Sequence, residues 1–225
     1  MTTVVSIAVI LAALLSGQAL SGQAAGQASP QATDVRPGEA KGLPPRLTPG
    51  DYQTHVQAGA VTIAAEFTGH SVATSDAALT TEDYVTVELG IYGKPDTRLR
   101  VSINDFSLRI NGRKQLYSAE PYGAIFHSLK DPSWVPPTPP ESHSKTSLGG
   151  SGGAPDAGPP PPVHMPIEVE RRMQQNVQKA ALPEGDRALP VAGVIFFPYR
   201  GKESGVHSVE LIYTGPAGKA TVALQ

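Results

Sequence analysis

The stretch DYVTVELGIY, Asp83–Tyr92, decides the fold class because apolar and polar residues alternate along it. The two sets are Val85, Val87, Leu89 and Ile91 against Tyr84, Thr86, Glu88 and Tyr92. Successive side chains of a β-strand point to opposite faces of its sheet. This period of two therefore predicts a strand with one buried face and one wet face.

The same period recurs in five further segments: AVTIAAEF (60–67), RLRVSI (98–103), DFSLRI (105–110), HSVELIY (207–213) and KATVAL (219–224). Another segment, VAGVIFFPY (191–199), is apolar on both faces and is interpreted as a central strand. Asn111-Gly112 is a strong hairpin signal because both residues tolerate positive φ, and it predicts a return strand over residues 113–117. With about eight strands, the predicted fold class is all-β, an immunoglobulin-like antiparallel β-sandwich.

The run SLGGSGGAPDAGPPPPVHMP, Ser147–Pro166, interrupts this pattern with glycine and proline. It is either a linker between two domains or a long loop within one. Residues 182–225 supply only three strands, too few to enclose a core, whereas residues 53–135 supply about five with an apolar face to cover. We therefore predict a single β-sandwich domain over residues 53–225, with a Pro/Gly-rich loop inserted at residues 132–166.

One α-helix is predicted within the insertion, over residues 167–181. Pro166 precedes its first turn, Glu168 and Glu170 lie at its positive end, and Lys179 lies at its negative end. Its apolar stripe is narrow and consists of Val169, Met173, Val177 and Ala180 or Ala181. Two interpretations stay open: the stripe docks on the open end of the sandwich, or it meets a partner.

The residues before the strands indicate export. Twelve uncharged residues, Val4–Leu15, are fewer than the about 20 that span a membrane, but they suit the apolar region of a secretory signal. A signal peptide is predicted over residues 1–19, with cleavage as late as residue 25. Residues 20–52, rich in Pro, Gln and Ala, are predicted to be a disordered tether because they bury too little apolar surface. The expected location is secreted or periplasmic, with no stable membrane anchor after cleavage.

Composition excludes several classes of function. The chain has no cysteine, which rules out disulfides, thiol catalysis and Cys-ligated metal sites. Its formal net charge of −2 at pH 7, without a basic block, argues against nucleic-acid binding. None of the common catalytic motifs occurs, and Ser142-x-x-Lys145, which has the spacing of serine acyl-enzymes, lies in a Pro/Gly-rich run unsuited to a helix. We therefore expect no catalytic residue, no metal and no cofactor.

The segment PYGAIFHSLKDPSWVPP, Pro121–Pro137, carries the candidate binding residues. These are Tyr122, Phe126, His127 and Trp134, the last being the single tryptophan of the chain. Prolines beside an aromatic residue favour an extended backbone, and a tryptophan there offers a ring face to a ligand. The alternative interpretation is a hydrophobic cover over one end of the core. Long ordered loops are often functional, which makes this segment the first place to look for a site.

Residues of the later strands follow a further pattern: Phe106, Leu108, Gly112 and Lys114, then Pro183, Gly185, Gly193, Phe197, Leu211 and Tyr213. The pattern resembles the telokin-like immunoglobulin domain of exported bacterial proteins. The resemblance covers about residues 59–224 apart from the insertion, which departs from the family pattern. The chain as a whole is similar to exported proteins known only as hypothetical. What the resemblance implies is an immunoglobulin-like fold, and the family has no catalytic residues to carry over.

Two classes of function are consistent with these observations. The first is an exported, non-enzymatic binding or structural module whose partner is a protein or glycan of the cell envelope. The second is a hydrolase or carbohydrate-active protein whose carboxylates come from loops. The two differ in whether Asp, Glu or His side chains converge in a pocket beside Trp134.

Overall fold

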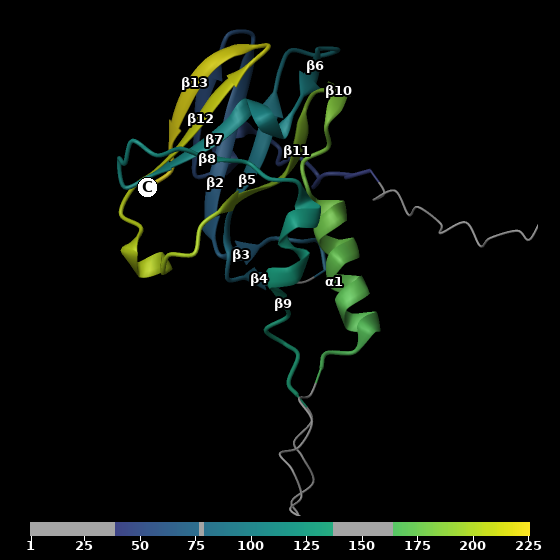
Figure 1. Ribbon diagram of the computed structural model, residues 1–225. Coiled ribbons are helices and arrows are strands. Elements are labelled where there is room, and N and C mark those ends of the chain that lie inside the picture. Colours follow the sequence, from purple (N-terminus) through teal and green to yellow (C-terminus); the bar gives the residue numbers. More distant parts are fainter. Residues whose placement is uncertain (1–38, 77–78, 137–163) are drawn as a thin grey trace, which may run out of the picture. The chain divides into compact units, whose positions relative to one another are not determined.

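The computed structural model describes residues 39–76, 79–136 and 164–225. Within these ranges the chain forms thirteen β-strands, all paired antiparallel in four sheets, and one α-helix (Figure 1). The prediction of a mostly β chain with antiparallel sheets and one helix is confirmed. The strands outnumber the about eight expected, because several of them are only two to four residues long and show no clear alternation in the sequence. The predicted signal peptide, residues 20–38 of the predicted tether and Ser142-x-x-Lys145 lie outside the described residues.

The first four-stranded sheet has the order β1-β2-β5-β11. Its strands are β1 (Thr54–Ala58), β2 (Val61–Gly69), β5 (Tyr84–Tyr92) and β11 (Val191–Pro198). In β5 every residue from Tyr84 to Ile91 is buried. The expectation that this strand has a wet face is therefore wrong, because other parts of the chain cover its polar side.

The second four-stranded sheet has the order β13-β12-β7-β8. Its strands are β13 (Gly218–Ala223), β12 (Val209–Gly215), β7 (Phe106–Ile110) and β8 (Tyr117–Ser118). Asn111 and Gly112 both have positive φ, 54° and 62°, as the hairpin signal requires. The return strand is shorter than predicted, since β8 begins only at Tyr117. The Asn111 side chain accepts hydrogen bonds from the His207 and Ser208 amides at 2.7 and 3.2 Å, which ties the turn to the start of β12.

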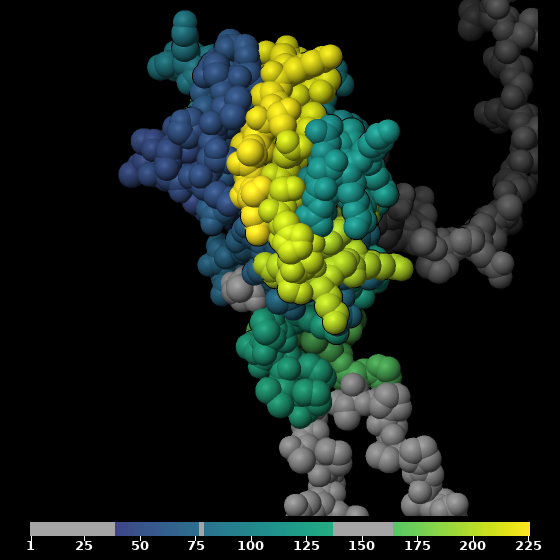
Figure 2. Space-filling model, turned by 90° about the vertical axis from the view of Figure 1, so that its left-hand side faces the viewer, coloured from purple at the N-terminus to yellow at the C-terminus, as the bar shows by residue number. Residues whose placement is uncertain are grey.

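Both four-stranded sheets contribute to one hydrophobic core. Fully or almost fully buried members from the two sheets include Ile63, Val87, Leu89, Leu108, Leu211 and Val222. Strand β13 lies beside β1, so the β12–β13 hairpin (yellow in Figure 2) lies next to the blue strands of the first sheet. The side-chain amide of Gln53 donates to the Leu224 carbonyl and ties the two sheets together at this side.

Two smaller sheets complete the strands. One has the order β3-β4-β9 and the other pairs β10 with β6. Their bounds are β3 (Ser71–Val72), β4 (Leu79–Thr81), β9 (Leu129–Lys130), β10 (Gly185–Ala188) and β6 (Arg98–Val101). In β6, Leu99 and Val101 are buried and Arg98 and Arg100 are exposed, as the alternating sequence predicts. Four short 3₁₀ segments also occur: Pro49–Asp51, Ile103–Asp105, Tyr122–Ser128 and Glu203–Gly205.

Strand β11 is buried on both faces but is not central in its sheet, which corrects the prediction. Its free edge is instead covered by three separate segments of the chain. Its carbonyls at Ala192, Val194 and Phe196 accept hydrogen bonds from the amides of Leu43, Leu182 and Glu120, at 3.0, 3.0 and 2.8 Å respectively. A buried carbonyl without a partner costs free energy, so these three bonds close an edge that would otherwise be open.

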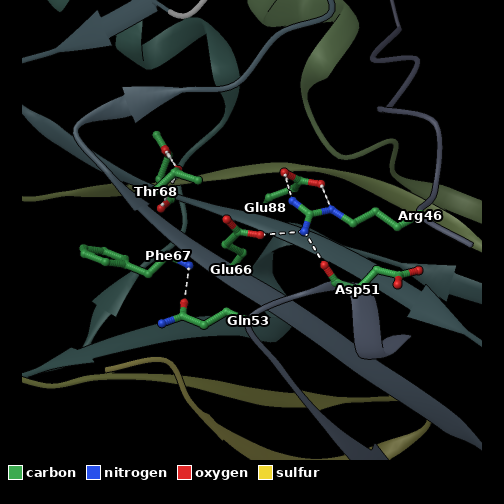
Figure 3. Close-up of polar contacts among 8 residues, drawn as sticks. Arg46, Asp51, Gln53, Glu66, Phe67, Thr68 and Glu88 are labelled. Atoms are coloured by element: carbon green, nitrogen blue, oxygen red, sulfur yellow. Dashed lines mark hydrogen bonds and ion pairs between the residues drawn. The ribbon is translucent and has the colours of Figure 1, made fainter. Parts of the chain in front are cut away.

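Residues 39–52 cover the polar side of β5, so the prediction of a disordered tether is wrong for this part. Arg46 donates from Nε and Nη2 to the Glu88 carboxylate at 3.1 and 2.9 Å and pairs with Glu66 at 2.6 Å (Figure 3). The Arg46 guanidinium also lies 4.4 Å from the ring centroid of Tyr52. The Tyr52 ring packs on Gly90, where a Cβ atom would lie only 2.6 Å from its hydroxyl. These contacts order a segment whose composition alone has too little apolar surface.

Helix α1 (Ile167–Ala180) agrees with the predicted helix over residues 167–181. Met173, Val177 and Ala180 of the predicted stripe are buried, while Val169 is only half-buried. The buried face belongs to a second hydrophobic cluster with Phe196 of β11 and Ile125 of the 3₁₀ segment beside the helix (Figure 1). The helix therefore docks on the first sheet. No helix in the described part of the chain is long and apolar enough to cross a membrane.

Gly193 offers a test of how closely β11 and the chain after α1 must approach. A Cβ atom at Gly193 would lie 2.4 Å from the Leu182 Cα and 2.6 Å from the Leu182 nitrogen. We expect Gly193→Ala to lower the free energy of unfolding by about 1–3 kcal/mol, the usual cost of overpacking. Gly123→Ala is the control, because a Cβ atom at Gly123 meets nothing within 4 Å. Urea denaturation gives both values, and equal stability of the two variants would contradict this packing.

Candidate functional site

The segment that carries the candidate binding residues is held rigidly at its middle. Ile125 of the 3₁₀ segment Tyr122–Ser128 is fully buried in the second cluster. The Ser128 hydroxyl lies 2.7 Å from the Thr81 hydroxyl of β4 and donates to the Ile125 carbonyl at 3.0 Å. The residues on either side of Ile125 and Ser128 therefore start from a fixed backbone. Such a backbone is what a preorganised site requires.

An aromatic hollow of about 640 Å³ lies between this segment and α1. Its apolar lining consists of Phe126, Leu129, Trp134, Pro136, Met165 and Met173. Asp131, Glu170 and Gln174 are among its polar lining residues. A volume of about 300–1,000 Å³ with a mostly apolar lining and a few polar groups is typical of sites for small molecules or single side chains.

A second, polar hollow of about 730 Å³ lies on the other side of His127. Asp83 contacts two other lining residues of this hollow. Its Oδ2 lies 3.3 Å from Nε2 of His127, and its Oδ1 lies 3.0 Å from Nε of Arg200. The Tyr84 hydroxyl donates to Oε2 of Glu120 at 2.9 Å. The two hollows share His127 as a lining residue.

The structure brings three of the four predicted binding residues together. The aromatic hollow is lined by Phe126, His127 and Trp134, because their segment lies beside α1. Tyr122 does not, since it lines a smaller hollow of about 240 Å³ beside β11. Its ring contacts Phe126 at a centroid distance of 5.9 Å, so it supports the hollow from behind.

Sequence reasoning missed the residues of the polar hollow. Asp83, Glu120 and Arg200 precede β5, follow β8 and follow β11, so they come together only when the strands pair. No spacing motif links positions so far apart in the chain. The one local signal is an aromatic residue beside two of the three charged residues, in Asp83-Tyr84 and Tyr199-Arg200.

Hydrogen bonds and burial shift the pKa values of two groups at these hollows. Those from the Ser133 hydroxyl and the Ser133 amide, at 2.5 and 2.8 Å, lower the pKa of Asp131 because they stabilise its carboxylate. Burial, and after it the hydrogen bond to Glu120, raises the pKa of Tyr84 to about 12. Asp131 therefore carries a negative charge at neutral pH, and Tyr84 remains a donor.

A group of three or more His, Asp or Glu side chains that would hold a metal ion does not occur among residues 39–76, 79–136 and 164–225. The Asp83–His127 contact lacks an adjacent hydroxyl in the lining of the polar hollow other than tyrosine. A serine or threonine nucleophile next to its base is the arrangement that acyl transfer needs.

In comparisons with protein-family models, curated proteins and solved structures, none matches this chain. The resemblance to the telokin-like immunoglobulin domain thus stays a proposal.

The Asp131–Ser133 contact gives a prediction for pH dependence. Removing the hydroxyl in Ser133→Ala leaves the carboxylate with fewer donors, so we expect the pKa of Asp131 to rise toward its ordinary value of about 3.9. The lowered pKa stabilises the folded state above the pKa of unfolded Asp131, and this contribution disappears as the pH falls through the folded pKa. Carbon-detected NMR titration of the carboxyl group measures the shift, with Ser204→Ala as control. An unchanged pKa in Ser133→Ala would contradict the assigned cause.

Proposed function

We propose that this chain is an exported, non-enzymatic binding protein with an immunoglobulin-like β-sandwich, and that its partner inserts an apolar group into the aromatic hollow. The observation that carries the proposal is the hollow itself. It joins the single tryptophan, Phe126 and two methionines on a backbone fixed by Ile125 and Ser128. Methionine side chains adapt to different shapes, which suits a surface that receives a side chain of a partner.

The shared core supports the sandwich part of the proposal. The apolar positions of the family pattern all belong to the core to which both four-stranded sheets contribute: Phe106, Leu108, Phe197, Leu211 and Tyr213. The Phe106 and Tyr213 rings lie 5.1 Å apart between their centroids. A core built from the alternating inward residues of two sheets is the arrangement of immunoglobulin-like domains.

The charges around the hollow support binding rather than hydrolysis. Asp131 and Glu170 are the carboxylates that line the hollow with Trp134, so they are the candidates for the alternative, a carbohydrate-active enzyme. Glycosidases of the common type need one carboxyl group with a raised pKa as acid and one ionised carboxylate. Hydrogen bonds lower the pKa of Asp131, which suits an ionised carboxylate and not a general acid. Burial raises the pKa of Asp105, but Asp105 does not line the hollow.

Selection of short random peptides tests the binding function, because the single tryptophan reports on the hollow by fluorescence. We expect selected peptides to carry a bulky apolar residue and to change the emission of Trp134. Phe126→Ala and Trp134→Ala each weaken binding by about tenfold or more, as removal of an aromatic anchor usually does, and calorimetry measures the affinity of Trp134→Ala, which lacks the fluorescent reporter. Leu47→Ala is the matched control, since Leu47 is an exposed apolar side chain outside the hollow.

Peptides that bind all three variants as tightly as the unmodified chain would place the binding site elsewhere. Nitrophenyl glycosides test the enzymatic alternative in the same preparation. We expect the unmodified chain and an Asp131→Asn, Glu170→Gln double variant to release nitrophenol at the same background rate. A faster release by the unmodified chain alone would replace the binding function by the hydrolase.

A further inference from the structure

The polar hollow beside His127 has two carboxylates in fixed positions. Glu120 is held by its backbone, which donates to the Phe196 carbonyl at 2.8 Å, and by its side chain, which accepts from the buried Tyr84 hydroxyl. The second carboxylate oxygen of Glu120, Oε1, has no hydrogen-bond partner among the described residues. Asp83 uses both of its oxygens, for His127 and Arg200. The hollow therefore contains one preorganised and unused acceptor.

Two guanidinium groups supply unused donors in the same hollow. Arg200 forms an ion pair with Asp83 through Nε, and its two terminal nitrogens have no ion-pair or hydrogen-bond partner within the described part of the chain. The side chain of Arg113, on the turn after β7, forms no ion pair or hydrogen bond with residues of the described ranges, whereas its backbone amide donates to the Ile110 carbonyl at 3.2 Å. The guanidinium is a planar fork of five donors, so both groups present several N–H bonds to the hollow.

Two tyrosine rings complete the lining. Tyr117 and Tyr199 stand nearly at right angles, 88°, with 5.9 Å between their centroids. Tyr199 is held by His70, whose ring stacks on it at a centroid distance of 6.3 Å. The two ring nitrogens of His70 lie 2.7 and 2.9 Å from the carbonyl oxygens of Tyr84 and Gly201. Partly buried rings in fixed orientations give a ligand an apolar surface to lie on.

We propose that the polar hollow binds a saccharide. A hydroxyl group is both a donor and an acceptor, so a ligand rich in hydroxyl groups uses the free Glu120 oxygen and the free guanidinium donors together. A simple anion would lie beside the Asp83 and Glu120 carboxylates, and a simple cation would lie beside Arg113 and Arg200. The C–H face of a sugar ring packs on an aromatic ring, which Tyr117 and Tyr199 provide. This site is separate from the aromatic hollow of the proposed function and shares one lining residue with it, His127.

Amide NMR titration with four neutral disaccharides tests the proposal: maltose, cellobiose, lactose and diacetylchitobiose. Each is added to about 10 mM, about tenfold above a Kd of about 1 mM. We expect at least one to shift the amides of Tyr117, Tyr199 and Arg200. Arg113→Ala weakens this binding by about tenfold, the loss that corresponds to a hydrogen bond from a charged group.

Lys114→Ala is the matched control, because Lys114 is the neighbouring exposed cation and does not line the hollow. We expect it to bind the sugar as the unmodified chain does. Trp134→Ala also leaves sugar binding unchanged, which separates this site from the aromatic hollow. Three results would overturn the proposal: no shift with any of the four sugars, equal weakening by Arg113→Ala and Lys114→Ala, or shifts of these amides by inorganic phosphate alone.

Discussion

The structure depends on hydrogen bonds along the edge of β11 that faces away from β5. The strand pairs with β5 along its whole length, and its outward carbonyls accept from the amides of Leu43, Leu182 and Glu120. These three amides belong to the segment before β1, the chain after α1 and the chain after β8. A buried strand edge without partners would leave polar groups unsatisfied and expose apolar residues. Each of the three segments therefore completes β11, and each is ordered by it.

Both hollows depend on the same edge. Glu120 has its place in the polar hollow because its amide bonds to the Phe196 carbonyl of β11. The end of α1 is held by the bridge between Ala181 and Val194, which keeps the Met173 face of the helix over the first sheet and against the Tyr122–Ser128 segment. The candidate binding residues are thus positioned by a strand from which they are distant in sequence. A change in β11 that opened this edge would disturb both hollows at once.

The alternation of apolar and polar residues predicted the strands that have one covered face. It did not predict where other segments of the chain cover the second face of a strand. Phe106–Ile110 and Leu99–Val101 alternate in sequence and in burial, because only one of their faces is covered. In β5 the polar residue Glu88 is buried, its side chain only 11% exposed, because Arg46 pairs with it from 42 residues away. No periodic signal identifies such a partner. Strands β8 and β9 also escape prediction from alternation, because they are too short to show a period.

The candidate site was predictable to the extent that its residues are neighbours in the chain. Phe126, His127 and Trp134 lie within one aromatic and Pro-rich segment, whose composition made them candidates. Tyr122 belongs to the same segment, but the 3₁₀ turn directs it toward another hollow. The Asp83, Glu120 and Arg200 constellation depends on strand pairing and on the β11 edge, which composition and spacing do not encode.

Amide hydrogen exchange tests the role of the β11 edge most directly. If the edge bonds form part of the cooperative core, the amides of Leu43, Leu182 and Glu120 exchange as slowly as those of β5 and β11, that is, through global unfolding. Leu43 is the decisive amide, because it lies in a segment whose composition is typical of a disordered chain. Slow exchange at all three positions is the result we predict. Fast exchange at Leu43, with slow exchange in β5 and β11, would show that residues 39–52 are only loosely attached and would contradict this account.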